Sequence, residues 1–393
     1  MDKIAVIVKD HKTYVHAEEA WYRFHGKKEN SVLFAVVPKG DPNNVLETLN
    51  EIIDENLWEE VVWIKTKSNF RPPSLLAKKR KSKIFNLYAK YREYIYNYLD
   101  VRKINKIASR YKGFDKVFSG HKNTQEHLAA RLNPKELYLL DSGNFNDKIN
   151  YTGYVDYSVK KIYRGSRIGR VLYKLTGLEL YNREKLKLFT VYADSLNTKH
   201  KTVKNNQDYK RNLIREKNIG DDVIFISSPI YTSAKGVTIT DYISYLKKIF
   251  DTLNIDTSHV IYVPNPIREN INDVEIISKA LGCKYDNRSI PVELKITKYA
   301  QLPRLCISPF STALVNIQEI SSNNMSLCCA WHPEFDYFDK LVLLRESQFE
   351  IEGNGIDFII INDAPSLFEI NSKKYDGEAL YDNFGEWNQK AKI

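Results

Sequence analysis

Asp141 is the residue of this chain whose neighbours best suit a catalytic base. It follows the apolar run 136–140 and precedes Ser142 and Gly143. Glycine accepts backbone conformations that other residues avoid, so the chain can turn sharply here and leave the carboxylate at the end of a strand. Such a carboxylate can take a proton from an incoming hydroxyl group. The alternative is an ordinary turn or helix-capping aspartate, which is a common feature.

A second polar motif, Asn265-Pro266-Ile-Arg268-Glu269, follows the apolar run 260–263. Prolines on both sides of Asn265 keep its backbone extended. The amide of Asn265 and the guanidinium of Arg268 can both donate hydrogen bonds to phosphate oxygens. The alternative is a proline-stiffened loop in which Arg268 and Glu269 form a surface ion pair.

A third motif, Ser311-Thr312, follows the apolar run 305–308 and is expected to open a helix. The free N–H groups and the dipole of a helix start bind anions, and two hydroxyl groups add donors. Serine and threonine are also the commonest helix caps without any ligand. Two further candidates are Glu293 and Ser228. Glu293 could bind a ribose diol or be a solvated helix carboxylate, and Ser228 could line a ligand-binding cleft.

Several kinds of site are not supported by the sequence. It contains no GxxxxGK[ST] motif, no GxGxxG after a strand and no HExxH, so nucleotide hydrolysis, dinucleotide binding and a zinc hydrolase lack support. It also contains no Asp-x-Asp turn, which disfavours a metal-held sugar diphosphate. The four cysteines have no CxxC spacing, which disfavours a zinc site or a disulfide framework and fits a reducing cytoplasm. No run of about 18 apolar residues is long enough to cross a membrane. Residues 1–8 are predicted to be a first strand rather than a signal peptide.

The net charge of +10 and the pI near 9.1 require an explanation. Basic residues gather in the segments 78–112 and 160–170. Candidate partners are nucleic acid, an anionic membrane surface and an acidic substrate, and the plainer alternative is a solvated basic face. Nucleic acid is disfavoured because the basic residues interleave with apolar helix positions and no aromatic RNA-binding motif is present.

Short apolar runs alternate with helical patterns, which is typical of parallel βαβ units. The predicted strands are 4–8, 32–37, 60–65, 116–119, 136–140, 187–193, 223–226, 260–263, 305–308, 326–331 and 356–361. The predicted helices are 43–56, 124–132, 238–253, 273–281, 311–320 and 338–348, and the segment 75–111 is predicted to form two more.

The polar segment 194–217 is predicted to be a linker between two domains of similar size. The expected domains are an N-terminal Rossmann-like domain, residues 1–205, with the base on the acceptor side, and a C-terminal Rossmann-like domain, residues 206–393, on the donor side. The fold class is therefore α/β, with two Rossmann-like domains. This organisation resembles the glycosyltransferase arrangement called GT-B, in which ligands bind in a cleft between the domains.

The three motifs in this order resemble those of the bacterial GT-B sialyltransferases of the lipooligosaccharide sialyltransferase and polysialyltransferase clan. That clan carries an acidic pair plus glycine, then His-Pro, then Ser-Ser or Ser-Thr. The counterparts here are Asp141-Ser142-Gly143, Asn265-Pro266 and Ser311-Thr312. The surroundings are similar too, because residues 119–123, with Gly120 and Asn123 as further cleft-lining candidates, precede the acidic turn.

Two positions depart from the clan. Ser142 replaces the second acid, and Asn265 replaces a histidine that contacts the nucleotide phosphate in the clan. Asparagine keeps a hydrogen-bond donor but cannot carry a proton. The departures leave open a different donor sugar or a weakened activity.

The resemblance implies an inverting, metal-independent transfer of sialic acid or a related nonulosonate from a CMP-activated donor to a hydroxyl group of a cell-surface glycan or glycolipid, as in lipooligosaccharide or capsule synthesis. Asp141 would be the base, and Ser311, Thr312 and Arg268 would hold the phosphate, with no cofactor. The enzyme would be cytoplasmic, with its basic segments contacting the acceptor or the inner membrane surface. Alternatives are a GT-B transferase with another nucleotide sugar and a basic nucleic-acid- or glycan-binding protein without catalysis.

Overall fold

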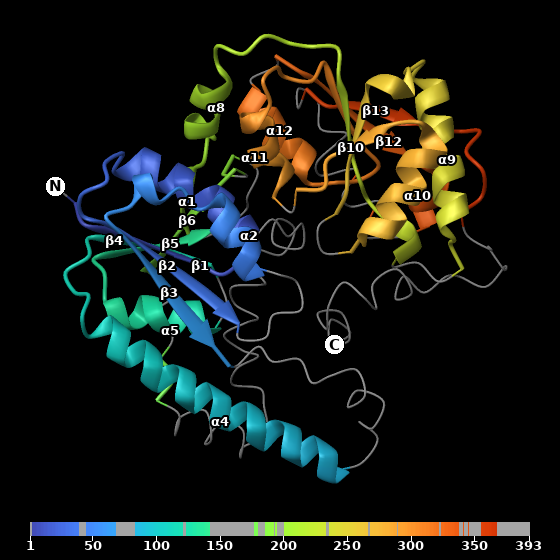
Figure 1. Cartoon of the computed structure of the whole chain (residues 1–393). Coiled ribbons are helices and arrows are strands. Elements are labelled where there is room, and N and C mark those ends of the chain that lie inside the picture. The colour runs from blue at the N-terminus through green and yellow to red at the C-terminus, as the bar shows by residue number, and fades with distance from the viewer. Residues whose placement is uncertain are drawn as a thin grey trace. The chain divides into compact units, whose positions relative to one another are not determined.

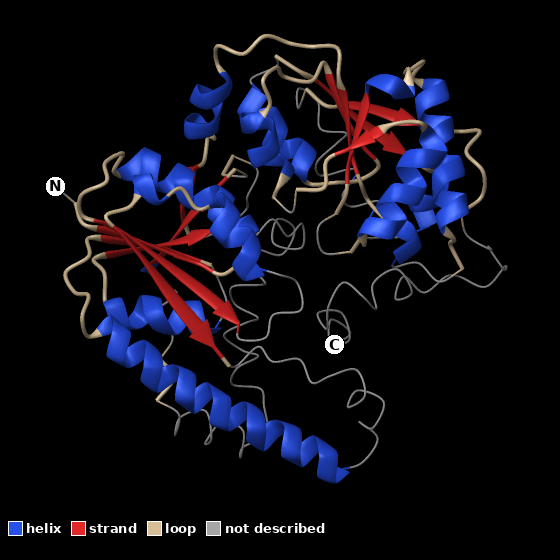
Figure 2. Ribbon diagram, viewed as in Figure 1, coloured by secondary structure: helices blue, strands red, loops and turns tan. Residues whose placement is uncertain are grey.

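The structure is a computed structural model, described for residues 2–38, 45–67, 83–120, 123–141, 177–179, 185–191, 193–194, 200–232, 236–265, 268–288, 290–321, 324–337, 341, 345 and 355–367. Its contacts divide the chain into two compact units, Met1–Tyr209 and Lys210–Ile393. Each unit combines one sheet with helices (Figures 1 and 2). The division falls within the segment 194–217, which carries strand β7 (Lys201–Lys204) and helix α8 (Asp208–Ile214) and is therefore not the plain linker that its composition suggested.

The first unit is built on a seven-stranded sheet in the order β3-β2-β1-β4-β5-β6-β7. All neighbouring strands are parallel. Besides β7, the strands are β1 (Ile4–Val8), β2 (Ser31–Pro38), β3 (Glu60–Thr66), β4 (Lys116–Ser119), β5 (Glu136–Leu140) and β6 (Leu186–Thr190). Strand β1 is buried along its whole length, as expected for an apolar run at the centre of a parallel sheet.

Helices cover both faces of this sheet. They are α1 (His11–Phe24), α2 (Val45–Ile52), α4 (Lys83–Ala108) and α5 (Asn123–Leu132). Figure 2 shows α1 and α2 on one face and α4 and α5 on the other. Alternate strand residues such as Ala5 and Ile7 share a core with Ile104 of α4 and Leu128 of α5. The sheet is therefore the middle layer of three.

One helix of this unit was missed, and two helix predictions need correction. The missed helix is α1. The segment 75–111 was expected to hold two helices, but its described part forms one continuous helix, α4. The helix expected over 43–56 is shorter, because α2 ends at Ile52 and a separate single turn, Glu55–Leu57, follows it.

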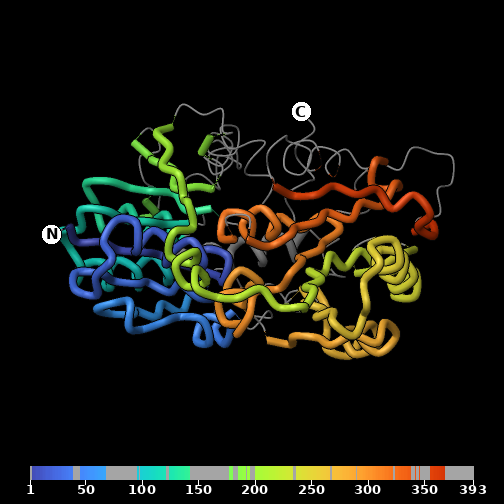
Figure 3. The backbone as a smooth tube through the Cα atoms, turned by 90° about the horizontal axis from the view of Figure 1, so that it is seen from above, coloured from blue at the N-terminus to red at the C-terminus, as the bar shows by residue number. Residues whose placement is uncertain are grey.

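The second unit is built on a six-stranded parallel sheet in the order β10-β9-β8-β11-β12-β13. Its strands are β8 (Val223–Ile226), β9 (Val260–Val263), β10 (Lys284–Tyr285), β11 (Leu305–Ser308), β12 (Ser326–Trp331) and β13 (Asp357–Ile360). Its helices are α9 (Ile239–Thr252), α10 (Ile271–Leu281), α11 (Val292–Lys298) and α12 (Ala313–Ser321). Figure 1 shows α9 and α10 on one face of the sheet and α11 and α12 on the other, and Figure 3 follows the same course from above. The helix predicted over 338–348 lies almost wholly outside the described residues.

Both sheets place their strands in the order 3-2-1-4-5-6, counting along each unit, and the first adds a seventh strand. This is the order of the doubly wound Rossmann fold. The prediction of two Rossmann-like α/β domains is confirmed. In such sheets a ligand binds outside the carboxyl ends of the strands, at the point where the order reverses. That point lies between β1 and β4 in the first unit and between β8 and β11 in the second.

Candidate functional site

The carboxyl ends of β8 and β11 are joined by a chain of serines. Ser308, the last residue of β11, donates its hydroxyl proton to the carbonyl of Ile226 at 2.9 Å. The Ser308 oxygen lies 3.3 Å from the hydroxyl of Ser228 and accepts the N–H of Ser311 at 3.2 Å. Because Ser308 has only one proton, Ser228 must be the donor between the two. Ser228 and Ser308 are both buried, so these hydrogen-bonded serines fix the start of α12 against the end of β8.

Ser311 and Thr312 lie just before α12, which begins two residues later than predicted. The Ser311 hydroxyl accepts the N–H of Ala313 at 3.3 Å, so Ser311 caps the helix, as the plainer alternative required. Thr312 differs. Within the described part of the chain, no hydrogen bond engages its amide or its hydroxyl group. Thr312 therefore offers two donors at the start of a helix, where the dipole favours an anion.

Asn265 and Arg268 share a tight turn after β9. The carbonyl of Asn265 accepts the N–H groups of Arg268 and Glu269 at 3.2 and 3.1 Å, while the N–H of Asn265 donates to Oε2 of Glu269 at 2.6 Å. Both Asn265 and Arg268 are half-buried. Burial lowers the pKa of Arg268, which means that its charge is partly removed from water. A partly desolvated guanidinium binds an anion more strongly than an exposed one.

Glu269 is a site residue that sequence reasoning missed. It was considered only as a surface partner of Arg268. In the structure its carboxylate instead accepts hydrogen bonds from the hydroxyl groups of Tyr262 and Tyr231, besides the N–H of Asn265. Burial raises the pKa of Glu269, against the effect of these bonds. The sequence did offer a signal for this role, because Glu269 lies four residues after Asn265, close enough for its carboxylate to accept the Asn265 N–H.

Glu293 lies in the first turn of α11 and is buried rather than solvated. Its Oε1 atom accepts a hydrogen bond from Nδ2 of Asn316 on α12 at 2.8 Å. This contact ties α11 to the helix that begins at the Ser311-Thr312 motif. Glu293 is thus connected through α12 to Ser311 and Thr312, the candidate phosphate-binding residues.

Asp141 directly follows β5 in the first unit, as predicted, and is 4% exposed. Its Oδ2 atom accepts the N–H of Val191 at 2.9 Å, just beyond the neighbouring strand β6. The carboxylate is therefore held at the carboxyl edge of the sheet. Its neighbours Ser142 and Gly143 lie outside the described residues, as does Pro266 in the second unit.

Gly120 directly follows β4, the strand between β1 and β5, and a side chain at this position would meet a neighbour. A Cβ atom there would lie 2.9 Å from both amide atoms of the Gln125 side chain. Gln125 is buried and donates to the carbonyl of Ile7 on β1 at 3.1 Å. Gly120 therefore leaves room for the contact that ties α5 to β1. Asn123 begins α5, and its side chain lies outside the description.

His11 is a second polar residue at this edge that sequence reasoning missed. It follows β1 and begins α1, next to the capping residue Asp10. His11 is 8% exposed, and burial lowers its pKa to about 4 despite the opposing charge of Asp10. Its ring is therefore neutral at pH 7. The available signal was the sequence 10–13, Asp-His-Lys-Thr, shortly after the first strand. Asp10 and Thr13 form a capping box, which marks the start of a helix at His11.

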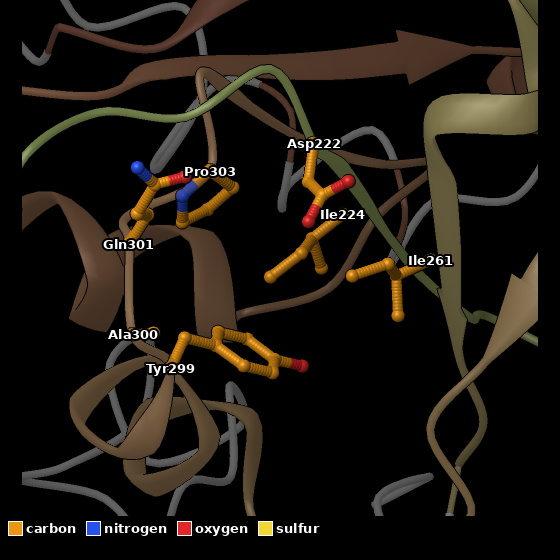
Figure 4. Close-up of a pocket in the computed structure, with 7 residues that line it drawn as sticks. All are labelled: Asp222, Ile224, Ile261, Tyr299, Ala300, Gln301 and Pro303. Carbon is orange, nitrogen blue, oxygen red and sulfur yellow. The ribbon is translucent and has the colours of Figure 1, made fainter.

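The pocket in Figure 4 lies at the opposite edge of the second sheet. It has a volume of about 340 Å³ and is lined by residues at the amino ends of β8, β9 and β11 and after α11, namely Asp222, Ile224, Ile261, Tyr299, Ala300, Gln301 and Pro303. Ligands of doubly wound sheets bind at the carboxyl edge. This pocket is therefore separate from the candidate site.

Asp286 is linked to this pocket through Tyr299, one of the lining residues, and lies in a cluster of charged side chains. Tyr299 donates to its Oδ2 atom at 3.0 Å, Arg288 forms a forked ion pair with it, and Nζ of Lys295 lies 3.3 Å from Oδ1. Burial by itself raises the pKa of Asp286, but the hydrogen bonds from Arg288 and the charge of Lys295 outweigh it. The net pKa lies well below the usual value of 3.8.

This cluster predicts a loss of stability in acid. Since the folded-state pKa of Asp286 is depressed, its contribution is complete above pH 4 and is lost as the pH falls through about 3.8 and below. We expect Asp286→Asn to lower the free energy of unfolding at pH 7 and to reduce the further loss between about pH 4 and 2. Urea unfolding across that range measures both effects. If the free energy of unfolding of the variant fell between about pH 4 and 2 as steeply as that of the wild-type protein, Asp286 would not be a cause of the acid sensitivity.

Two negative findings concern the described residues only. Among them, no cluster of three or more His, Cys, Asp or Glu side chains is arranged to hold a metal ion. No described helix has the length and apolar character needed to cross a membrane.

The sequence matches no protein-family model, and no curated protein matches it. The structure is similar to that of Arabidopsis thaliana UGT89C1 complexed with UDP, with 8% identity, a TM-score of 0.43 and coverage of 92% of this chain and 86% of that one. It is also similar to the GT-B domain of a sialyltransferase from Photobacterium damselae, with 12% identity, a TM-score of 0.42 and coverage of 90% and 99%. A third similar structure is MurG from Acinetobacter baumannii, with 10% identity, a TM-score of 0.40 and coverage of 91% and 86%. At these values the function must be argued from the chain's own residues.

Proposed function

We propose that this protein is an inverting, metal-independent glycosyltransferase that moves sialic acid, or a related nonulosonate, from a CMP-activated donor to a hydroxyl group of a glycan acceptor. The observation that carries the proposal is the arrangement at the carboxyl edge of the second sheet. There, Thr312 offers donors at a helix start and Arg268 offers a partly desolvated charge. These are the groups that a phosphate monoester needs, and they lie at the ends of β9 and β11, on the two sides of β8.

The proposed chemistry divides the roles between the two units. In the second unit Arg268 and Thr312 bind the phosphate of CMP and stabilise the negative charge that grows as the bond to the sugar breaks. Ser311 positions Thr312 by capping α12. Glu293 is proposed to bind the ribose. In the first unit Asp141 takes the proton of the acceptor hydroxyl as it attacks the sugar from the face opposite CMP, which inverts the configuration.

Asn265 takes the place of a histidine in the resembled clan. An amide can donate a hydrogen bond to the phosphate but cannot deliver a proton to it. We therefore propose that CMP leaves as an anion stabilised by hydrogen bonds and the charge of Arg268, without protonation by this residue.

The proposed acceptor is a cell-surface glycan or glycolipid, such as lipooligosaccharide or capsular polysaccharide, modified in the cytoplasm. The basic segments 78–112 and 160–170 are proposed to contact this acceptor or the anionic inner leaflet of the membrane. Each basic residue near such a surface contributes about 1 kcal/mol. Of these segments, the structure describes residues 83–112.

Nucleotide-dependent stabilisation tests the donor assignment. We expect CMP to raise the unfolding temperature of the protein, because a ligand present at a hundred times its dissociation constant adds about 2.7 kcal/mol to the free energy of unfolding. UDP at the same concentration is expected to add less. Thermal shift with CMP, CDP, UMP and UDP makes the comparison. Stabilisation by UDP without CMP would replace the proposed donor with a uridine diphosphate sugar, and no stabilisation by any of them would remove the nucleotide-sugar proposal.

A further inference from the structure

Two adjacent serines just after β8, Ser227 and Ser228, are linked by hydrogen bonds to the two parts of the candidate phosphate site. One part is the helix start at Ser311 and Thr312, and the other contains Asn265 and Arg268. Ser228 joins the serine chain that ends at Ser311. Ser227 is buried on the other side, with its hydroxyl group 2.8 Å from that of Tyr262 and 3.2 Å from that of Tyr242. The Ser227 N–H also donates to the carbonyl of Val263 at 2.9 Å, which ties the end of β8 to the end of β9.

The network that begins at Ser227 ends on the carboxylate of Glu269. Tyr262 donates to its Oε1 atom at 2.5 Å, and Tyr231 donates to the same atom at 3.2 Å. The N–H of Asn265 donates to Oε2 at 2.6 Å. Each carboxylate oxygen thus has at least one donor, and all of these donors are neutral. Hydrogen bonds of this kind favour the ionised form of a buried carboxyl group.

Glu269 holds Asn265 at both ends of its backbone. The carboxylate accepts the Asn265 N–H, and the Glu269 N–H donates to the Asn265 carbonyl. The turn is therefore closed on itself and also anchored, through Tyr262, to β9. A turn fixed before ligand binding loses less conformational entropy when the ligand arrives.

We propose that Glu269 is a positioning residue that holds Asn265 and Arg268 in the arrangement that binds the phosphate of the nucleotide. This inference rests on the proposed function, since it assigns the phosphate to those two residues. Glu269 does not contact the phosphate. It acts by fixing the backbone from which Asn265 and Arg268 project.

The Glu269→Gln variant tests this role. The introduced amide keeps one oxygen for Tyr262, but its NH2 group faces the Asn265 N–H, donor against donor, so the anchor is lost at nearly constant volume. We expect the affinity for CMP to fall about tenfold, as one lost anchoring hydrogen bond would cause. The affinity for cytidine, which has no phosphate, should change less than about twofold. Isothermal titration calorimetry with both ligands gives the ratio.

Two further variants keep the test decisive. Glu275→Gln changes an exposed glutamate on α10 and should leave both affinities at the wild-type value. Tyr231→Phe removes the longer of the two tyrosine contacts and should weaken CMP about threefold without affecting cytidine, which supplies the same readout if Glu269→Gln does not fold. Unchanged CMP affinity in both Glu269→Gln and Tyr231→Phe, or equal losses for CMP and cytidine, would overturn the positioning role alone. A wild-type protein that binds neither ligand would overturn the proposed donor and this role with it.

Discussion

Asp141→Asn is expected to reduce sugar transfer at least about 100-fold, because general bases contribute roughly 10² to 10⁴ in rate. The asparagine oxygen can still accept the Val191 N–H that Asp141 accepts at 2.9 Å. The substitution therefore removes the basic oxygen and keeps the local hydrogen bond. CMP binding, assigned to the second unit, should remain within about twofold. The measurement is the rate of transfer from CMP-sialic acid to a terminal galactoside.

Asp194→Asn provides a matched control in the same unit. Asp194 is 76% exposed and pairs with Lys204 on the surface, so its replacement should leave both transfer and stability unchanged. Near-normal turnover by Asp141→Asn, in an assay where the wild-type protein is active, would exclude Asp141 as the base. His11, the buried neutral imidazole at the end of β1, would then be the next residue to replace.

Lys295→Met is expected to lower the free energy of unfolding by about 3 kcal/mol, because removing one partner of a buried ion pair leaves the other charge uncompensated. The Lys295 side chain is 1% exposed, and Nζ lies 3.3 Å from Oδ1 of Asp286. The same nitrogen donates to the Asp286 carbonyl at 2.9 Å, which would also lose its partner. Arg288 and Tyr299 remain, so the estimate is at the lower end for such pairs. Urea denaturation at pH 7 measures the difference.

Lys284→Met is the control for this effect. Lys284 is exposed on the edge strand β10, only two residues before Asp286. Surface changes of this kind usually stay within about 0.5 kcal/mol. If Lys295→Met and Lys284→Met had the same small effect, the buried pair would contribute nothing to stability, and the depressed pKa of Asp286 would have to come from Arg288 and Tyr299.

The sequence alone determined most strands of both sheets. Strands β1, β4, β5, β8, β9, β11 and β12 have the predicted bounds. The reason is local, since each is a short apolar run bounded by polar or turn residues, and a strand buried on both faces leaves that pattern in the sequence. The polar residues placed at strand ends, such as Asp141 and Ser311, followed from the same bounds.

Helix α1 shows what the pattern could not reveal. Thr13, His16, Glu18 and Glu19 are buried in it, so its buried surface is not apolar and the helical period is hidden. Two of these groups are paired by distant residues: the Glu19 carboxylate accepts the N–H of Tyr209, and the His16 ring contacts Asn205. Strand β7 escaped detection for a related reason, because this edge strand carries two lysines among four residues.

Only the tertiary structure decided how the site is held together. The serine chain joins Ser228 to Ser308, and the tyrosine network joins Ser227 to Glu269, across separations of 80 and about 40 residues. A single sequence shows which side chains can donate or accept a proton. Which of them meet depends on strand order and register, because neighbours in a parallel sheet are separated along the chain by whole crossover connections.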